Sequence, residues 1–120
     1  MLTNRFAAAS ESVREFADGE FIVREGETGQ EMFIIQSGIA IVRRSDTEVA
    51  RLGKGEFFGE MSVLESSARD ADVIAHGRTR VLALGPGALF VRLRRDPSFA
   101  LELLQALSSR VRVLNERLGT

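Results

Sequence analysis

Three residues in one short stretch could together bind a phosphate and a sugar. Gly59 and Glu60 come directly before a short apolar turn, Met61 to Leu64, and Arg69 follows it. The first backbone amides of such a turn have no partners and point outward, and the helix start adds partial positive charge. Arg69 adds a planar guanidinium that can donate to two phosphate oxygens at once. The stretch therefore predicts an anion site.

Glu60 indicates that the ligand is more than inorganic phosphate. A carboxylate repels a phosphate, but it is a suitable acceptor for a ribose hydroxyl. Gly59 and Glu60 alone would also fit an ordinary turn with an acidic helix start, and Arg69 alone would fit a surface arginine. Their combined spacing favours a nucleotide over inorganic phosphate.

The stretch Phe58 to Val73 resembles the phosphate-binding cassette of the cyclic-nucleotide-binding domain family, which includes catabolite activator proteins, protein kinase A regulatory subunits and cyclic-nucleotide-gated channels. Upstream, the segment Gly26 to Gly38 is similar to the glycine-bounded strand pair of the same family, and the resemblance covers roughly Val13 to Leu118. The residues that match the cassette without an insertion are Phe58, Gly59, Glu60, Met61, Ser62, Val63, Leu64, Arg69, Ala71 and Val73.

The resemblance implies a role for each cassette residue. Glu60 would accept the ribose 2′-hydroxyl beside the Gly59 amide, and Arg69 would pair with the cyclic phosphate, helped by the amides of Asp70 and Ala71. The implied ligand is cAMP or cGMP, with cAMP as the default, and no metal is implied. The candidate ligand-binding residues are Phe58, Gly59, Glu60, Met61, Ser62, Arg69, Asp70, Ala71 and Asn115.

Two residues depart from the family pattern. Ala68 stands where proline is usual, and Asp70 stands where the family has alanine, serine or threonine. A carboxylate about 5 Å from the phosphate, at an effective dielectric constant of about 20, would repel it by about 3 kcal/mol. Asp70 could instead turn to solvent, pair with an arginine, or accept from a guanine edge. If it abolishes binding, the chain would be a ligand-free dimerisation or interaction module of the same fold.

Short apolar runs separated by glycine and acidic turns are typical of a compact all-β structure. Through the resemblance we expect a mainly β fold with flanking helices: an eight-stranded, jelly-roll-like β-roll over about residues 12–85, an internal cassette helix, and C-terminal B and C helices over about 86–118. Phe57 and Phe58 are predicted to be core residues rather than base-stacking ones. The runs are Val13–Phe16, Phe21–Val23, Met32–Gln36, Ile39–Val42, Val49–Leu52, Asp72–Ala75 and Val81–Leu84.

The last third of the chain has a helical pattern. Pro86 can open a short helix, and Pro97 can open a long one behind Asp96 as N-cap. Asn115 lies beside the apolar positions of the long helix and could reach a bound base. These apolar positions form a stripe that could pair with a second copy of the chain or pack on the roll. Its members are Leu104, Leu107, Val111, Leu114 and Leu118.

The composition of the chain argues against several classes of function. The 120 residues, 44% of them hydrophobic, predict one domain, residues 1–120, with a real core. With no cysteine and only His76, a metal site is not expected, and Ser62 has no partner for nucleophilic catalysis, so we expect no enzyme. A net charge of −1 predicts no direct nucleic-acid contact, and no apolar span predicts a membrane, so we expect a soluble, cytoplasmic protein. Its output would pass to an unknown effector protein or fused domain.

Overall fold

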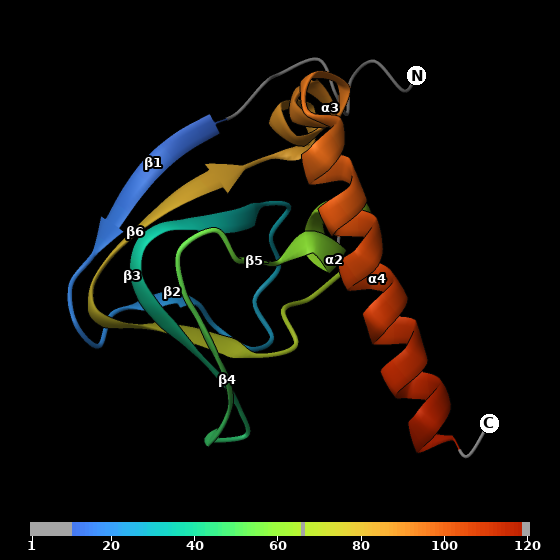
Figure 1. Cartoon of the computed structure of the whole chain (residues 1–120). Helices are drawn as coiled ribbons and strands as arrows, with labels where there is room; N and C mark the ends of the chain where they lie inside the picture. The colour runs from blue at the N-terminus through green and yellow to red at the C-terminus, as the bar shows by residue number, and fades with distance from the viewer. Residues whose placement is uncertain (1–10, 66, 119–120) are drawn as a thin grey trace. The chain divides into compact units, whose positions relative to one another are not determined.

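The structure is a computed structural model, and it describes residues 11–65 and 67–118 of the chain (Figure 1). The chain divides into two compact units, one extending to Ala88 and the other starting at Leu89. The elements are β1 (Glu11–Phe16), β2 (Phe21–Val23), β3 (Met32–Arg44), β4 (Thr47–Leu52), β5 (Phe57–Phe58), α2 (Glu60–Glu65), β6 (Asp72–Leu84), α3 (Pro86–Arg95) and α4 (Pro97–Arg117).

Two long antiparallel strands, β3 and β6, form the centre of the sheet in the first unit (Figure 1). Near one end of this pair, β5 joins β3 and β1 joins β6; near the other end, β4 joins β3 and β2 joins β6. Besides its pairing with the other long strand, each long strand therefore has two further neighbours, one near each end. This arrangement curls the sheet into a roll, with mostly β structure and helices, as the sequence predicts.

The long strands bend together at Gly38 and Gly77. Both glycines have positive φ, 88° and 73°, and the register between β3 and β6 shifts on either side of Ser37. A Cβ on Gly38 would lie 2.5 Å from the carbonyl oxygen of Arg78, so this position also requires the absence of a side chain. Thr79 is fully buried beside the bend and donates to the carbonyl oxygen of Ile39 at 3.0 Å.

The bend explains the difference between the expected and the observed strand count. The sequence predicts separate runs on either side of Gly38 and of Gly77, whereas in the structure β3 and β6 each run through their bend, and their pairing resumes after a shift of register. The expected count of eight is therefore not confirmed, because the described residues form six strands. The two-residue strand β5 falls outside the predicted runs.

Alternating residues of the bent strands fill the interior of the roll. Phe33 and Phe58 stack with their ring centroids 5.1 Å apart, which confirms Phe58 as a core residue. Burial of such side chains stabilises the fold by about 1.5–3 kcal/mol each. The buried cluster consists of Val23, Phe33, Ile35, Ala40, Phe58, Val73, Val81 and Ala83.

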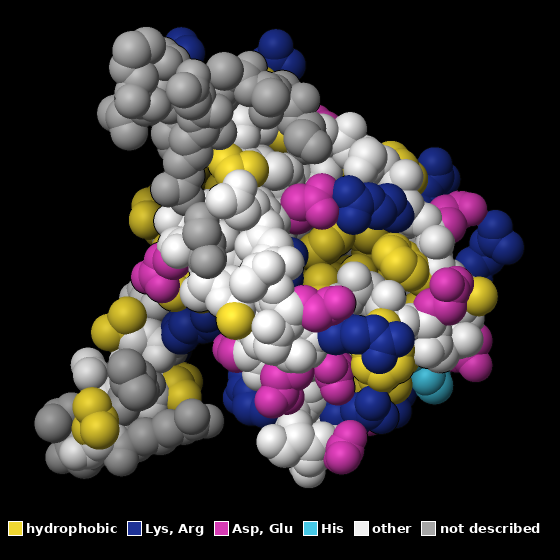
Figure 2. All heavy atoms as spheres, turned by 180° about the vertical axis from the view of Figure 1, so that it is seen from behind, with side chains coloured by type: hydrophobic (Ala, Val, Ile, Leu, Met, Phe, Trp, Pro, Cys, Tyr) yellow, Lys and Arg dark blue, Asp and Glu magenta, His cyan; other side chains and the backbone are white. Residues whose placement is uncertain are grey.

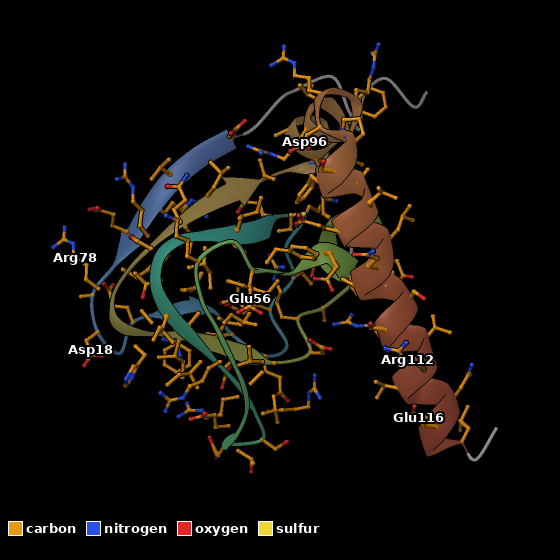
Figure 3. All side chains as sticks on the ribbon, viewed as in Figure 1. Asp18, Glu56, Arg78, Asp96, Arg112 and Glu116 are labelled. Carbon is orange, nitrogen blue, oxygen red and sulfur yellow. The ribbon has the colours of Figure 1, made fainter. Side chains whose placement is uncertain are left out.

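Charged side chains on the outer surface of the roll form ion pairs. Figure 2 shows basic and acidic side chains interspersed around apolar ones on the face seen from behind. Asp18 accepts from the Gly77 amide at 2.6 Å, which ties the turn after β1 to the bend of β6, and Arg78 extends away from the roll nearby (Figure 3). Salt bridges join Arg14 to Glu31, Arg51 to Glu48 and Arg78 to Glu15.

The second unit contains most of α3 and all of α4. Asp96 lies between the two helices (Figure 3) and accepts from the Phe99 amide at 3.1 Å, which confirms it as the N-cap of α4. Arg92 lies over the Phe99 ring, 5.8 Å from its centroid. The helix presents exposed apolar side chains at Leu104 and Val111, whereas the side chain of Leu114 lies outside the described part. No described helix is long and apolar enough to cross a membrane.

Candidate functional site

The cassette helix α2 begins directly after β5, where the predicted site residues start. Gly59 takes a φ of +84°, which turns the chain from the strand into the helix, and its carbonyl oxygen accepts from the Ser62 amide at 3.1 Å. Glu60 is the first residue of α2 and is buried, with 7% of its surface exposed. The glycine thus places a buried carboxylate at the start of a short helix.

Backbone hydrogen bonds position Arg69. Its amide donates to the Glu27 carbonyl oxygen at 2.8 Å, and its own carbonyl oxygen accepts from the Gly26 amide at 2.8 Å. Ala68 forms an isolated bridge with Thr28 beside them. The loop before β3 therefore fixes the segment that carries the arginine, although Ala68 replaces the usual proline.

The Arg69 guanidinium extends toward the start of β3 and of α2. Nη1 donates to the carbonyl oxygen of Glu31 at 2.8 Å, and Cζ lies 5.6 Å from the centre of the Phe33 ring. Gly29 and Gly59 line it closely: a Cβ on Gly29 would be 2.6 Å from Nη2, and one on Gly59 would be 2.9 Å from Nη1. Two glycines from separate loops thus make room for one guanidinium.

Partial burial lowers the pKa of the Arg69 guanidinium, while the carboxylates of Glu31 and Glu27 act in the opposite direction. An arginine nevertheless remains charged at neutral pH because its ordinary pKa is so high. Glu31 is itself paired with Arg14, 2.6 Å away. The site therefore presents a guanidinium held by the backbone carbonyl of Glu31, which is suited to an incoming anion.

The other cassette residues support this arrangement. The Ser62 hydroxyl is buried and donates to the Ser67 carbonyl oxygen at 3.2 Å, so it closes the loop after α2. Ala71 is buried, and Met61 is partly exposed. Whether Met61, Ser62 and Ala71 contact a ligand stays a prediction.

Asp70 turns outward. Its side chain is 71% exposed, and Oδ2 lies 3.4 Å from Nη2 of Arg44 at the end of β3. Among the possibilities that the sequence leaves open, the structure shows an exposed carboxylate paired with an arginine. The repulsion expected from an unpaired carboxylate beside the phosphate is therefore reduced.

Asn115 belongs to the second unit, near the end of α4, and is exposed. The other candidate residues belong to the first unit. The reach of Asn115 to a bound base thus stays a prediction.

The structure adds three residues that the sequence reasoning did not single out. Gly29 and the Glu31 carbonyl contact the Arg69 guanidinium, and Arg44 contacts Asp70. Gly29 carried an ambiguous signal, because a glycine between apolar runs fits either a turn or the close approach of another group. Glu31 and Arg44 carried no signal. Every residue has a backbone carbonyl, and nothing in the sequence distinguishes Arg44 among the fifteen arginines.

A separate hollow of about 550 Å³ runs along β2, and Glu27 belongs to its lining. Its other lining residues come from β2 and the adjoining segments, Gly19 to Arg24, rather than from the cassette. The described residues hold no cluster of three or more histidine, aspartate or glutamate side chains that could bind a metal ion.

A roll built on two bent strands, with a short helix that begins after Gly59 and a partly buried arginine beside it, has the features of a ligand-binding domain. The cyclic nucleotide-binding domain family matches residues 13–96, and the chain belongs to this family. The fold is the β-roll of that family.

Three similar proteins illustrate the relationship. The cAMP-dependent protein kinase regulatory subunit of Mucor circinelloides f. lusitanicus is 40% identical over 94 residues, which cover 75% of this chain and 22% of that protein. The cGMP-dependent protein kinase of Eimeria tenella is 38% identical over 73 residues, 61% of this chain and 7% of that protein. The crystal structure of Thermus thermophilus catabolite activator protein superposes with a TM-score of 0.77 at 30% identity, covering 98% of this chain and 56% of the other.

Proposed function

We propose that this chain is a sensor domain that binds a purine cyclic nucleotide monophosphate and transmits its occupancy through α4. The observation that carries the proposal is the Arg69 guanidinium, held beside the start of α2 by the Glu31 carbonyl and the close approach of Gly29 and Gly59. A fixed guanidinium next to a helix start is suited to a phosphate. The buried Glu60 would accept the ribose hydroxyl.

The relatives support cAMP and cGMP as the two candidate ligands, because their names include both cAMP-dependent and cGMP-dependent kinases. We take cAMP as the default. The domain is proposed to be regulatory rather than enzymatic, to act in the cytoplasm without direct contact to nucleic acid, and to operate with the roll and the helices as one functional domain. Its effector would be a partner protein or a fused domain.

Calorimetric titration with cAMP and with cGMP tests ligand binding. We expect saturable binding of at least one of them, and a ligand at 100 times its Kd should stabilise the fold by about 2.7 kcal/mol. Arg69→Ala should abolish most binding while the fold survives. Arg78→Ala is the matched control, because Arg78 is 80% exposed in its pair with Glu15 and lies at the β6 bend. Failure of the native chain to bind either nucleotide at millimolar concentration would favour the ligand-free interaction module.

A homodimer through α4 is the second part of the proposal. Leu104 and Val111 are 61% and 58% exposed, and they lie seven residues apart on one helix face. If the dimer and the ligand both use this helix, each must strengthen the binding of the other by the same factor. Sedimentation with and without nucleotide measures this coupling.

Leu104→Asp and Val111→Asp should weaken association, because each places a charge on the exposed apolar face of α4. Ser109→Asp adds the same charge at an exposed position on the opposite side of the same helix and serves as the control. A dimerisation constant that stays the same in all three variants and with saturating ligand would remove α4 from the mechanism.

A further inference from the structure

The residue after the phosphate-binding arginine carries a negative charge, and the structure gives that charge a partner. Arg44, the last residue of β3, lies with Nη2 3.4 Å from Oδ2 of Asp70. Its Nε also donates to the main-chain carbonyl oxygen of Asp70 at 3.1 Å. One guanidinium therefore contacts both the side chain and the backbone of Asp70.

We propose that Arg44 is a positioning residue for the nucleotide site, which holds the Asp70 carboxylate outside the phosphate position and offsets its charge. The inference rests on the proposed function. It assigns the site a further residue, which comes from the end of β3 and is not part of the cassette.

The backbone contact gives Arg44 a second effect. In a trans peptide the carbonyl and the following N–H point in opposite directions. A donor that holds the Asp70 carbonyl toward Arg44 therefore directs the Ala71 amide away from it. That amide is one of the groups expected to assist Arg69 with the phosphate. Arg44 thus fixes the orientation of a peptide in the phosphate-binding segment.

Arg44 is itself held at the base of a tight hairpin. It pairs with Thr47 across a two-residue loop, Ser45 and Asp46, whose φ values are 51° and 64°. Positive φ at both loop residues is the geometry that matches the twist of two antiparallel strands. The Ser45 amide donates to Oε1 of Glu25 at 3.3 Å, which fastens the hairpin to the loop before β3.

A double-mutant cycle tests the proposal, with the affinities for cAMP and cGMP measured by calorimetry. Arg44→Ala should weaken the binding of both nucleotides about threefold to tenfold, because both partners of the pair are exposed and solvent screens the charge. Asp70→Ala should bind within about twofold of the native chain, since Arg44 already offsets the carboxylate. Arg44→Ala in the Asp70→Ala background should then have less effect than it has alone.

Arg51→Ala is the matched control. Its side chain is 51% exposed against 46% for Arg44, and it too pairs with a carboxylate, that of Glu48 at 2.8 Å. It should leave the affinity unchanged, and circular dichroism without ligand should show that all variants fold.

Two results overturn the proposal. Arg44→Ala could bind as tightly as the native chain, or it could lose equal affinity with and without the Asp70 carboxylate, which would show that Arg44 does not act through that carboxylate. In either case the native chain still binds nucleotide and the proposed function stands. A native chain that binds neither nucleotide would remove both.

Discussion

Gly29 lies so close to the Arg69 guanidinium that a Cβ atom on it would be 2.6 Å from Nη2. The contact is with the end of a flexible side chain, so an added methyl group would displace the guanidinium rather than the backbone. We therefore expect Gly29→Ala to weaken cAMP binding about tenfold and to change the free energy of unfolding by less than about 1 kcal/mol. Calorimetry and urea unfolding measure the two effects separately.

Gly53→Ala is the control for this experiment, because a Cβ there would meet no heavy atom nearer than 4.0 Å. It should bind cAMP like the native chain. Equal affinities for the Gly29→Ala and Gly53→Ala variants would show that the position of the guanidinium has no influence on the ligand.

Gly38→Ala should destabilise the roll by about 3 kcal/mol or more, because it combines a strained positive φ with overlap against rigid backbone. The added Cβ would lie 2.5 Å from the Arg78 carbonyl oxygen. Gly77→Ala shares the positive φ but has no heavy atom within 4 Å of the added Cβ, so it should lose only about 1–2 kcal/mol. Urea unfolding measures the free energy of unfolding of both variants, and the comparison is valid if their m-values are equal. Equal losses would mean that close approach does not matter at this bend.

Thr79→Val should destabilise the fold by about 1–2 kcal/mol although it keeps the shape of the side chain. The Thr79 hydroxyl is buried and is placed to donate to the carbonyl oxygens of Ile39 at 3.0 Å and of Gly77 at 3.1 Å. Thr47→Val, on exposed β4, provides the comparison. If both variants unfold at the same urea concentration, the hydroxyl does not stabilise the bend.

Glu60 should set the preference for a ribose over a deoxyribose. A hydrogen bond to a charged group contributes about 1.5–3 kcal/mol, so the native chain should bind cAMP at least about tenfold more tightly than 2′-deoxy-cAMP. Glu60→Ala should bring this ratio close to one, while Glu65→Gln, at the exposed end of the same helix, should preserve it. A ratio that survives in Glu60→Ala would assign the hydroxyl to another acceptor.

The sequence points to candidate site residues more readily than it indicates the path of the strands. Gly59, Glu60 and Arg69 are recognisable because their types and spacing match a chemical task within one short stretch. The bends are harder to predict from the sequence, since Gly38 and Gly77 resemble the turn glycines that end a strand. Only the pairing of β3 with β6 shows that the strands continue.

Contacts between distant segments explain what the sequence did not predict. The pairing of Arg44 with Asp70 depends on the register of a hairpin that ends beside the cassette, and local pattern carries no information on it. The short strand β5 has only two residues, too few for any periodicity. The N-cap at Asp96 was predictable because capping is a local interaction.

The pairing of β6 with β1, β2 and β3 has a consequence for how the protein folds. Glu11 at the start of β1 pairs with Leu84 at the end of β6, so the roll closes between segments far apart along the chain. Such non-local pairing slows folding to milliseconds or longer. On the ribosome, a nascent chain that has not yet reached Asp72 would expose three strands with unpaired edges, which are prone to associate with other chains. Synthesis of the last strand is therefore the step that ends this exposure.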